Sequence, residues 1–356
     1  MQRRQLLRTL PGVAVAGLAG CIGDGDTAAP TDTLTDTATS TAAPDGPSGV
    51  YVQSFREGMV SSGTATAGDY EVGLLLAVPH TFWTVTGTER TVNRKESRHS
   101  VHLMAQVWDG ETNVVLPETG VTVEVLRDGD LVSEEVIYPM LSQRMGFHYG
   151  GNFSLGGDGT FTARVSTSPL SIERLGSFAG RFDEAATAEI EFDFDQDVRD
   201  QLTVAELDAA GNPGAIRPME MNAMPTGVAP TTESLPGTTV GSERLDDAEL
   251  VLGYTGGELA GDAGSYLYVS ARTRYNDLVL PMMSLDATVT RDGETVYEGA
   301  LNRAVHPTLQ YHYGVPVDGV RAGDEVSLTV VTPPQVGRHE GYERAFLQMD
   351  GASFTV

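Results

Sequence analysis

The stretch Val121-Thr122-Val123-Glu124-Val125, followed by Arg127-Asp128-Gly129-Asp130, decides the fold of this chain. Apolar and polar residues alternate through its first five positions, which is the period of a β-strand with one buried face. The Asp-Gly pair is typical of a tight hairpin turn, and residues 131–138 can return as the second strand. The stretch therefore predicts a β-hairpin.

A second copy of this pattern lies further along the chain. Residues 286–290, the turn Asp292-Gly293 and residues 295–297 predict the same hairpin. Three landmarks recur at one spacing of 164 residues (280 − 116, 291 − 127 and 312 − 148), which predicts two homologous domains. The landmarks are Leu116-Pro117 with Leu280-Pro281, Arg127-Asp128-Gly129 with Arg291-Asp292-Gly293, and His148-Tyr149-Gly150 with His312-Tyr313-Gly314.

Short strands separated by Gly and Asp turns run through both copies. Residues 188–194 and 326–331 alternate in the same way, and no stretch after the N-terminal segment has a helical period. We therefore expect an all-β protein with two tandem immunoglobulin-like β-sandwich domains. The first spans residues 50–197 and the second, divergent repeat spans residues 247–356. Residues 198–246, rich in Pro, Gly, Thr and Met, are expected to be a linker.

The N-terminal segment has the features of an export signal. The pair Arg3-Arg4 precedes a short apolar run that ends Leu18-Ala19-Gly20-Cys21, which predicts a twin-arginine signal with a lipoprotein cleavage site over residues 1–21. Cys21 is then the lipidated residue. Residues 22–49, rich in Thr, Ala, Asp and Pro, are expected to be a disordered stalk. We expect a protein anchored by lipid to the extracellular face of the cell membrane.

The composition excludes several classes of protein. With one Cys among 356 residues, the chain can form neither an internal disulfide nor a Cys-based zinc site. Its 49 Asp and Glu against 23 Lys and Arg give a net charge of −26, so a nucleic-acid partner is not expected. Lys95 is the only lysine. A surface rich in acid and poor in lysine indicates the salt-adapted protein of a halophilic archaeon.

Candidate metal ligands lie on a predicted strand at residues 101–107. Strand alternation places Val101 and Leu103 on one face and His102, Met104 and Gln106 on the other. In the second copy the apolar face is kept, whereas Tyr266 and Tyr268 replace His102 and Met104. One face is therefore expected to be structural in both copies, and the other to carry different chemistry in each.

Three stretches resemble a known family: His102-Leu103-Met104-Ala105, Tyr138-Pro139-Met140 and Gly146-Phe147-His148-Tyr149-Gly150-Gly151-Asn152. They are similar to the exported iron-transport protein family, whose periplasmic or lipid-anchored immunoglobulin-like domains bind copper and support iron uptake with a membrane permease. The resemblance implies His102, Met140 and His148 as ligands. We add Met104 and Met145 as candidate sulfur ligands.

The chain departs from that family at two ligand positions. Met104 stands where the family has a carboxylate, and the family's later loop histidine has no counterpart in residues 168–182, where Glu173 and Asp183 are the nearest substitutes. The second repeat keeps His312 and His339 but has Ala304 in place of the loop methionine.

The residues themselves leave two interpretations open. Two histidines with one or two methionines make a plausible copper site, because imidazole suits copper, iron or zinc and thioethers favour Cu(I). The alternative is a buried polar cluster in which methionines fill gaps in the core. The resemblance places the loop of His80 near the metal, whereas the sequence around it is equally compatible with a surface residue. Met219, Met221 and Met224 form either a thioether cluster or apolar packing of the linker.

No phosphate loop, nucleophile elbow, dinucleotide fingerprint or His-Glu-x-x-His motif occurs, so an enzyme is not expected and an exported redox enzyme is the weakest hypothesis. The leading hypothesis is a lipid-anchored cell-surface protein that captures a copper or iron ion and hands it to a membrane iron permease. The alternative is a non-metal protein of adhesion or envelope organisation. A homodimer is compatible with either hypothesis.

Overall fold

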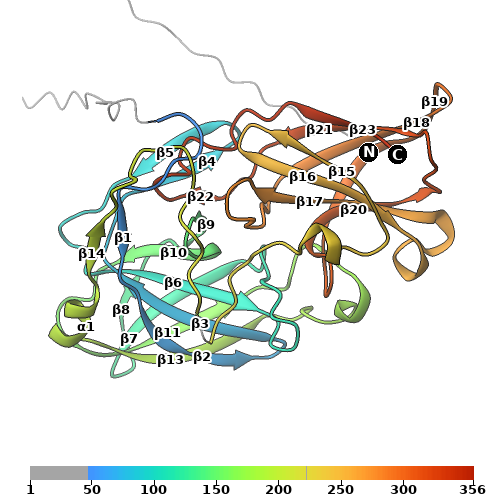
Figure 1. Cartoon of the computed structure of the whole chain (residues 1–356). Helices are drawn as coiled ribbons and strands as arrows, with labels where there is room; N and C mark the ends of the chain where they lie inside the picture. Colours follow the sequence, from blue (N-terminus) through green and yellow to red (C-terminus); the bar gives the residue numbers. More distant parts are fainter. Residues whose placement is uncertain (1–46, 222) are drawn as a thin grey trace, which may run out of the picture. The chain divides into compact units, whose positions relative to one another are not determined.

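The computed structural model describes residues 47–221 and 223–356, and these are built almost entirely from β-strands (Figure 1). The predicted all-β sandwich class is confirmed. The signal, Cys21 and nearly all of the predicted stalk lie outside the described residues. Within the described ranges, no helix has the length and apolar character needed to cross a membrane.

The first repeat contains an eight-stranded sheet and a four-stranded sheet. The eight-stranded sheet has the order β2 (Val60–Ala67), β3 (Tyr70–Ala77), β6 (Val101–Trp108), β10 (Gly146–Phe153), β9 (Tyr138–Ser142), β22 (Gly337–Arg338), β4 (Phe82–Thr86) and β5 (Glu89–Asn93). The four-stranded sheet has the order β13 (Ala186–Phe194), β11 (Gly159–Thr167), β7 (Val121–Arg127) and β8 (Asp130–Glu134).

The alternation predicted for residues 101–107 is confirmed. Val101 and Leu103 of β6 lie in the main core with Val123 of β7 and Phe161 of β11. Their neighbours on the strand face the other way, yet they too are buried, so β6 has no exposed residue. A strand that is buried on both faces can hold polar side chains away from water.

The hairpin turn forms as its sequence predicts. Asp128 and Gly129 have φ values of 51° and 87°, the left-handed region that a two-residue hairpin turn requires. The returning strand differs from the prediction, because β8 ends at Glu134 and the chain re-enters a strand at Tyr138 as β9, in the other sheet. This change of sheet places Met140 beside β10. In the second repeat the equivalent residues form one unbroken strand, β19 (Glu294–His306).

The second repeat forms a nine-stranded sheet. Its order is β15 (Thr238–Leu245), β16 (Ala248–Thr255), β17 (Gly264–Thr273), β20 (Gln310–Asp318), β19, β18 (Ser284–Arg291), β21 (Glu325–Thr332) and β23 (Gly351–Thr355), with β12 (Glu173–Arg174) also paired to β19. Residues 238–245, which the sequence assigns to the linker, are a strand of this repeat. They pair with β16 through a tight turn at Asp246, whose φ is 53°.

The two repeats exchange short strands with each other. β22 of the second repeat pairs in parallel with β9 of the first, Gly337 opposite Met140, and Figure 1 shows it among the strands of the first repeat. β12 of the first repeat pairs in parallel with β19 of the second, Glu173 opposite Ala304. Both separations are 164 residues (337 − 173 and 304 − 140), so the exchange is reciprocal. The described residues accordingly form one compact unit.

The remaining elements are short. β1 (Phe55–Glu57) pairs with β14 (Val204–Glu206), which follows the only described α-helix, α1 (Gln196–Gln201). Asp195 caps this helix by accepting a hydrogen bond from the Val198 backbone N–H. The described 3₁₀ helices are η1 (Gly176–Phe178), η2 (Thr232–Ser234), η3 (Gly257–Leu259) and η4 (Gly261–Ala263).

Candidate metal centre

Three of the predicted ligands meet on the outer face of the eight-stranded sheet. His102 lies on β6 opposite Asn152 of β10, and His148 of β10 lies opposite Met140 of β9. Strand alternation turns these side chains away from the main core, onto a face that is nevertheless buried. The register of three neighbouring strands therefore brings His102, Met140 and His148 together.

Two further histidines join this group from loops. His80 follows β3, and its ring centroid lies 4.1 Å from that of His102. His339 follows β22, and its ring centroid lies 4.7 Å from that of His80 and 5.2 Å from that of His148. His80, His102 and His339 each offer one nitrogen within 4.8 Å of the others. We call His80, His102, His148, His339 and Met140 the histidine centre.

Hydrogen bonds fix the orientation of three of its imidazoles. The Asn152 amide Nδ2 donates to the backbone oxygen of His80 at 2.9 Å, so its Oδ1 accepts from His102 Nδ1 at 2.9 Å. His148 Nδ1 lies 3.0 Å from the backbone oxygen of Gly146. His80 Nδ1 lies 2.9 Å from the Glu57 carboxylate and 3.0 Å from the Val78 backbone oxygen. Each Nδ1 therefore carries the proton, which leaves the lone pair on Nε2.

The Nε2 atoms of His80, His102 and His148 are all buried, and none has a hydrogen-bond partner among residues 47–221 and 223–356. His339 Nε2 lies 3.3 Å from Met140 Sδ. Leaving a buried nitrogen unpaired costs about 1–3 kcal/mol. Three such atoms in one cluster are the pattern of a metal site, because a cation accepts all of these lone pairs at once.

A glycine on β10 allows two side chains of the centre to approach the backbone closely. A Cβ atom on Gly150 would lie 2.8 Å from His102 Nε2 and 3.0 Å from Met140 Sδ. Gly150 of β10 is also the direct cross-strand partner of Met104 of β6. The space between the imidazole and the thioether therefore depends on the absence of a side chain at residue 150.

Burial keeps His102, His148 and His339 of the centre uncharged near neutral pH. It lowers the pKa of His148 to about 4. The pKa of His102 and that of His339 also lie well below the ordinary value, chiefly through burial and then through the neighbouring His80. A neutral imidazole is the form that binds a metal, so these ligands need no proton release near pH 7.

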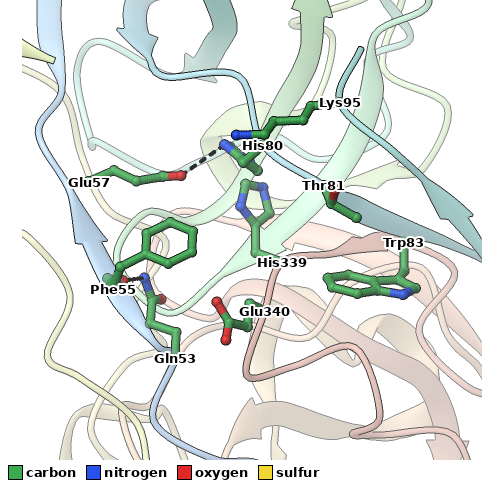
Figure 2. A pocket seen from close by; sticks show the side chains of 9 residues that line it. All are labelled: Gln53, Phe55, Glu57, His80, Thr81, Trp83, Lys95, His339 and Glu340. Carbon is green, nitrogen blue, oxygen red and sulfur yellow. Dashed lines mark hydrogen bonds and ion pairs between the residues drawn. The ribbon is translucent and has the colours of Figure 1, made fainter. Parts of the chain in front are cut away.

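One side of the centre opens to a pocket of 210 Å³ lined in part by Glu57, His80, Lys95, His339 and Glu340. Figure 2 shows the Glu57 carboxylate directed at the His80 ring, with the His339 ring beside it. A carboxylate that accepts from a ligating histidine fixes the ring and raises its basicity. Glu57 is thus placed to hold His80 and to offset the charge of a bound cation.

Met104 and Met145 lie in a neighbouring group of side chains. They pack with Leu75, Trp108 and Met224. The two acids considered as substitutes for the missing histidine lie elsewhere: Glu173 accepts from Asn302, and Asp183 pairs with Arg174. The sequence alone did not assign His80 and His339 to the centre. The signal for His339 was the histidine missing from residues 168–182 together with a loop histidine in the second repeat, and the signal for His80 was its position in a loop that the family resemblance places near the metal.

The equivalent position in the second repeat is filled by protein. The residues offset by 164 from His102, Met140, His148 and His339 are Tyr266, Ala304, His312 and Leu175. The Tyr266 hydroxyl lies 3.0 Å from His312 Nε2. A Cβ atom on Gly314, the counterpart of Gly150, would lie 2.5 Å from that hydroxyl. A tyrosine hydroxyl thus lies against Gly314 in the second repeat, where the His102 imidazole and the Met140 thioether lie against Gly150 in the first.

Comparisons with known proteins give partial matches. Residues 233–355 match a family model described as a domain of unknown function, DUF7350. No curated protein matches the chain. One similar solved structure is a copper-bound variant of FetP from uropathogenic Escherichia coli strain F11. The match covers 38% of this chain and 97% of the FetP chain, with 19% identity and a TM-score of 0.30. Another is the as-isolated FetP of the same strain. That match covers 38% of this chain and 95% of the FetP chain, with 20% identity and a TM-score of 0.31.

Proposed function

We propose that this protein binds one copper ion at the histidine centre and carries it at the cell surface. The observation that supports the proposal most directly is the set of three buried Nε2 atoms without a partner among the described residues. Their Nδ1 atoms are all held by acceptors, so the free lone pairs belong to fixed rings. A purely structural polar cluster would explain the Nδ1 contacts but would leave these three nitrogens unpaired.

The donor set favours copper over iron. Four imidazoles and one thioether suit copper, whereas iron in an exchangeable site is better served by oxygen ligands. The carboxylate nearest to the ligand nitrogens, Glu57, accepts a hydrogen bond from His80 Nδ1. A Met at residue 104, in place of an acid, removes a further oxygen ligand from this face. We therefore propose copper as the cargo, with His80, His102, His148, His339 and Met140 as its ligands.

Cu(II) titration of the purified protein tests this function. The repeats supply a matched pair of variants, because His148 and His312 occupy the same position in the two copies. We expect one Cu(II) per chain in the wild type and in His312→Ala, with nitrogen hyperfine structure in the electron paramagnetic resonance spectrum. His148→Ala should bind at least tenfold more weakly, which is about 1.4 kcal/mol. Equal affinity in both variants, or no copper binding by the wild type, would refute the proposal.

We also propose that the protein is held at the membrane by a lipid on Cys21 and passes its ion to a membrane permease. The pocket beside His80 and His339 supports this role, because it leaves one side of the centre open to an incoming or departing ion. Cell fractionation tests the anchor: Cys21→Ser should move the protein from the membrane to the medium. A variant that stays with the membrane would contradict it.

A further inference from the structure

Most of the methionines of this chain gather in one place. The chain has eleven methionines, and six of them lie in or against one cluster on the outer face of the eight-stranded sheet. Met104, Met145 and Met224 are buried there, and Met59, Met219 and Met221 pack against them partly exposed. We call these six residues the methionine cluster. It is separate from the histidine centre, whose thioether is that of Met140.

Three different parts of the chain supply the buried thioethers. Met104 lies on β6, opposite Leu75 of β3. Met145 lies in the turn between β9 and β10, where its backbone N–H donates to Ser142 Oγ at 3.1 Å. Met224 comes from the segment that joins the two repeats, and its Sδ atom occupies the space above Gly73, where a Cβ atom would collide with it.

The segment that carries Met224 is fixed to the first repeat. The backbone N–H of Met219 donates to the Arg144 backbone oxygen at 2.8 Å, and Ile216 donates in the same way to Gln143 Oε1 at 2.9 Å. Thr226 Oγ1 donates to the Met219 backbone oxygen at 3.0 Å and closes the loop. The segment that carries Met224 is therefore held against the first repeat by hydrogen bonds.

A buried amide without a partner lies within this apolar group. Gln106 follows Met104 by two residues on β6, lies opposite Gly73 and is fully buried. Neither its Nε2 nor its Oε1 atom has a hydrogen-bond partner in the described parts of the chain. Packing alone does not account for an unpaired amide among thioethers and Trp108, since a leucine would fill the same space without that cost.

We propose that Met104, Met145 and Met224 form a second metal site, which binds Cu(I) through thioether sulfur and leaves the Gln106 amide facing the ion. Thioethers are soft, neutral ligands and favour Cu(I) over divalent ions. A neutral set of ligands also suits a monovalent ion, because the charge left uncompensated in the interior is smaller. The partly exposed Met59, Met219 and Met221 give the ion a sulfur-lined approach from the surface.

The site lies beside the histidine centre. His102 and Met104 are two residues apart on one strand face, a separation of about 6.8 Å along a β-strand. One sheet face therefore holds an imidazole-rich site and a thioether-only site side by side. The two differ in the oxidation state they prefer, Cu(I) being the ion that thioether sulfur selects.

Ag(I), a redox-inert probe for Cu(I), tests the proposal in a protein with an impaired histidine centre. The background variant is His148→Ala with His339→Ala, labelled with ¹³C on the methionine methyl groups. At one equivalent of Ag(I), we expect the methyl signals of Met104, Met145 and Met224 to shift together. The signals of Met283 and Met349, which lie in the main core, should stay in place. Unshifted signals of the three, or equal shifts of all methionines, would overturn the proposal.

A double variant separates loss of the site from loss of the fold. Met104→Leu with Met224→Leu keeps the apolar volume and removes two sulfurs. We expect at least tenfold weaker Ag(I) binding in the background variant, and unchanged Cu(II) binding when the histidine centre is intact. The matched control Met283→Leu should bind Ag(I) normally. Unchanged Ag(I) affinity in the double variant would refute the thioether site, whatever the outcome of the Cu(II) titration.

Discussion

His339 Nε2 lies 3.3 Å from Met140 Sδ, although 199 residues separate the two in the sequence. The contact exists because β22 leaves the second repeat and pairs with β9 of the first, which places His339 directly over the outer face of that sheet. The first repeat therefore lacks one candidate ligand unless the second is folded beside it. The histidine centre is formed by the pair of repeats and by neither one alone.

The first prediction follows from this contact. His339→Ala removes the one ligand that the second repeat supplies, so copper affinity should fall at least tenfold, or about 1.4 kcal/mol. The measurement is competition with a chelator of known affinity. His99→Ala is the control, since His99 lies outside the centre and contacts the Glu96 backbone N–H. A wild-type affinity in His339→Ala would show that the first repeat binds the ion by itself.

A second prediction concerns the space at Gly150. An added methyl would lie 2.8 Å from His102 Nε2 and 3.0 Å from Met140 Sδ, so it would displace two candidate ligands. Gly150→Ala should therefore abolish detectable copper binding, while overpacking lowers the free energy of unfolding by about 1–3 kcal/mol. The matched control is Gly227→Ala, whose Cβ would meet Val115 only at an ordinary 3.7 Å. Copper titration and urea unfolding measure the two effects, and a Gly150→Ala protein that binds copper normally would contradict this account of the space.

The third prediction tests the role of Glu57 in holding His80. Glu57→Gln keeps the size of the side chain and removes its charge, and loss of such a carboxylate typically lowers metal affinity 10–100-fold. We expect copper affinity to fall about tenfold, the lower end of that range. The Val78 backbone oxygen still accepts a hydrogen bond from His80 Nδ1 at 3.0 Å and holds the ring in part. Glu340→Gln is the control: this carboxylate lines the same pocket but accepts from Ser54. Equal affinities in the two variants would refute a role for Glu57.

Local sequence was sufficient to predict the faces of the strands. The alternation around His102 and the landmark at His148 depend on neighbours within a few residues, so the period of two predicts which side chains share the outer face. The hairpin at Asp128-Gly129 was predictable for the same reason, since two residues in the left-handed region define the turn.

The full ligand set depends on contacts that no local pattern contains. His80 reaches the centre from a loop, and His339 reaches it through a strand exchange between repeats. In the first repeat, Leu175 stands at the position that His339 holds in the second (339 − 164). When one repeat supplies a candidate ligand to the other, the sequence shows no histidine at that position in the first copy. The second copy then has a histidine for which it offers no partner.

The filled site of the second repeat gives the last prediction, a pH dependence of stability. His312 Nδ1 lies 3.0 Å from the Gln310 backbone oxygen, so its Nε2 accepts a hydrogen bond from the Tyr266 hydroxyl and has no room for a proton of its own. Burial lowers the pKa of His312 to about 4, whereas in the unfolded chain the pKa is about 6.5. Between these values the unfolded state takes up a proton and the folded state does not.

The contribution of His312 to stability therefore falls as the pH decreases from about 6.5 to about 4, by about 3 kcal/mol. His312→Gln removes the titrating group. Over that pH range, the free energy of unfolding of His312→Gln should fall by about 3 kcal/mol less than that of the wild type. Urea unfolding of the metal-free proteins at pH 7.5 and 4.5 measures the difference. The buried histidines of the centre contribute equally to both proteins and cancel, so parallel pH profiles would contradict a neutral His312 held by Tyr266.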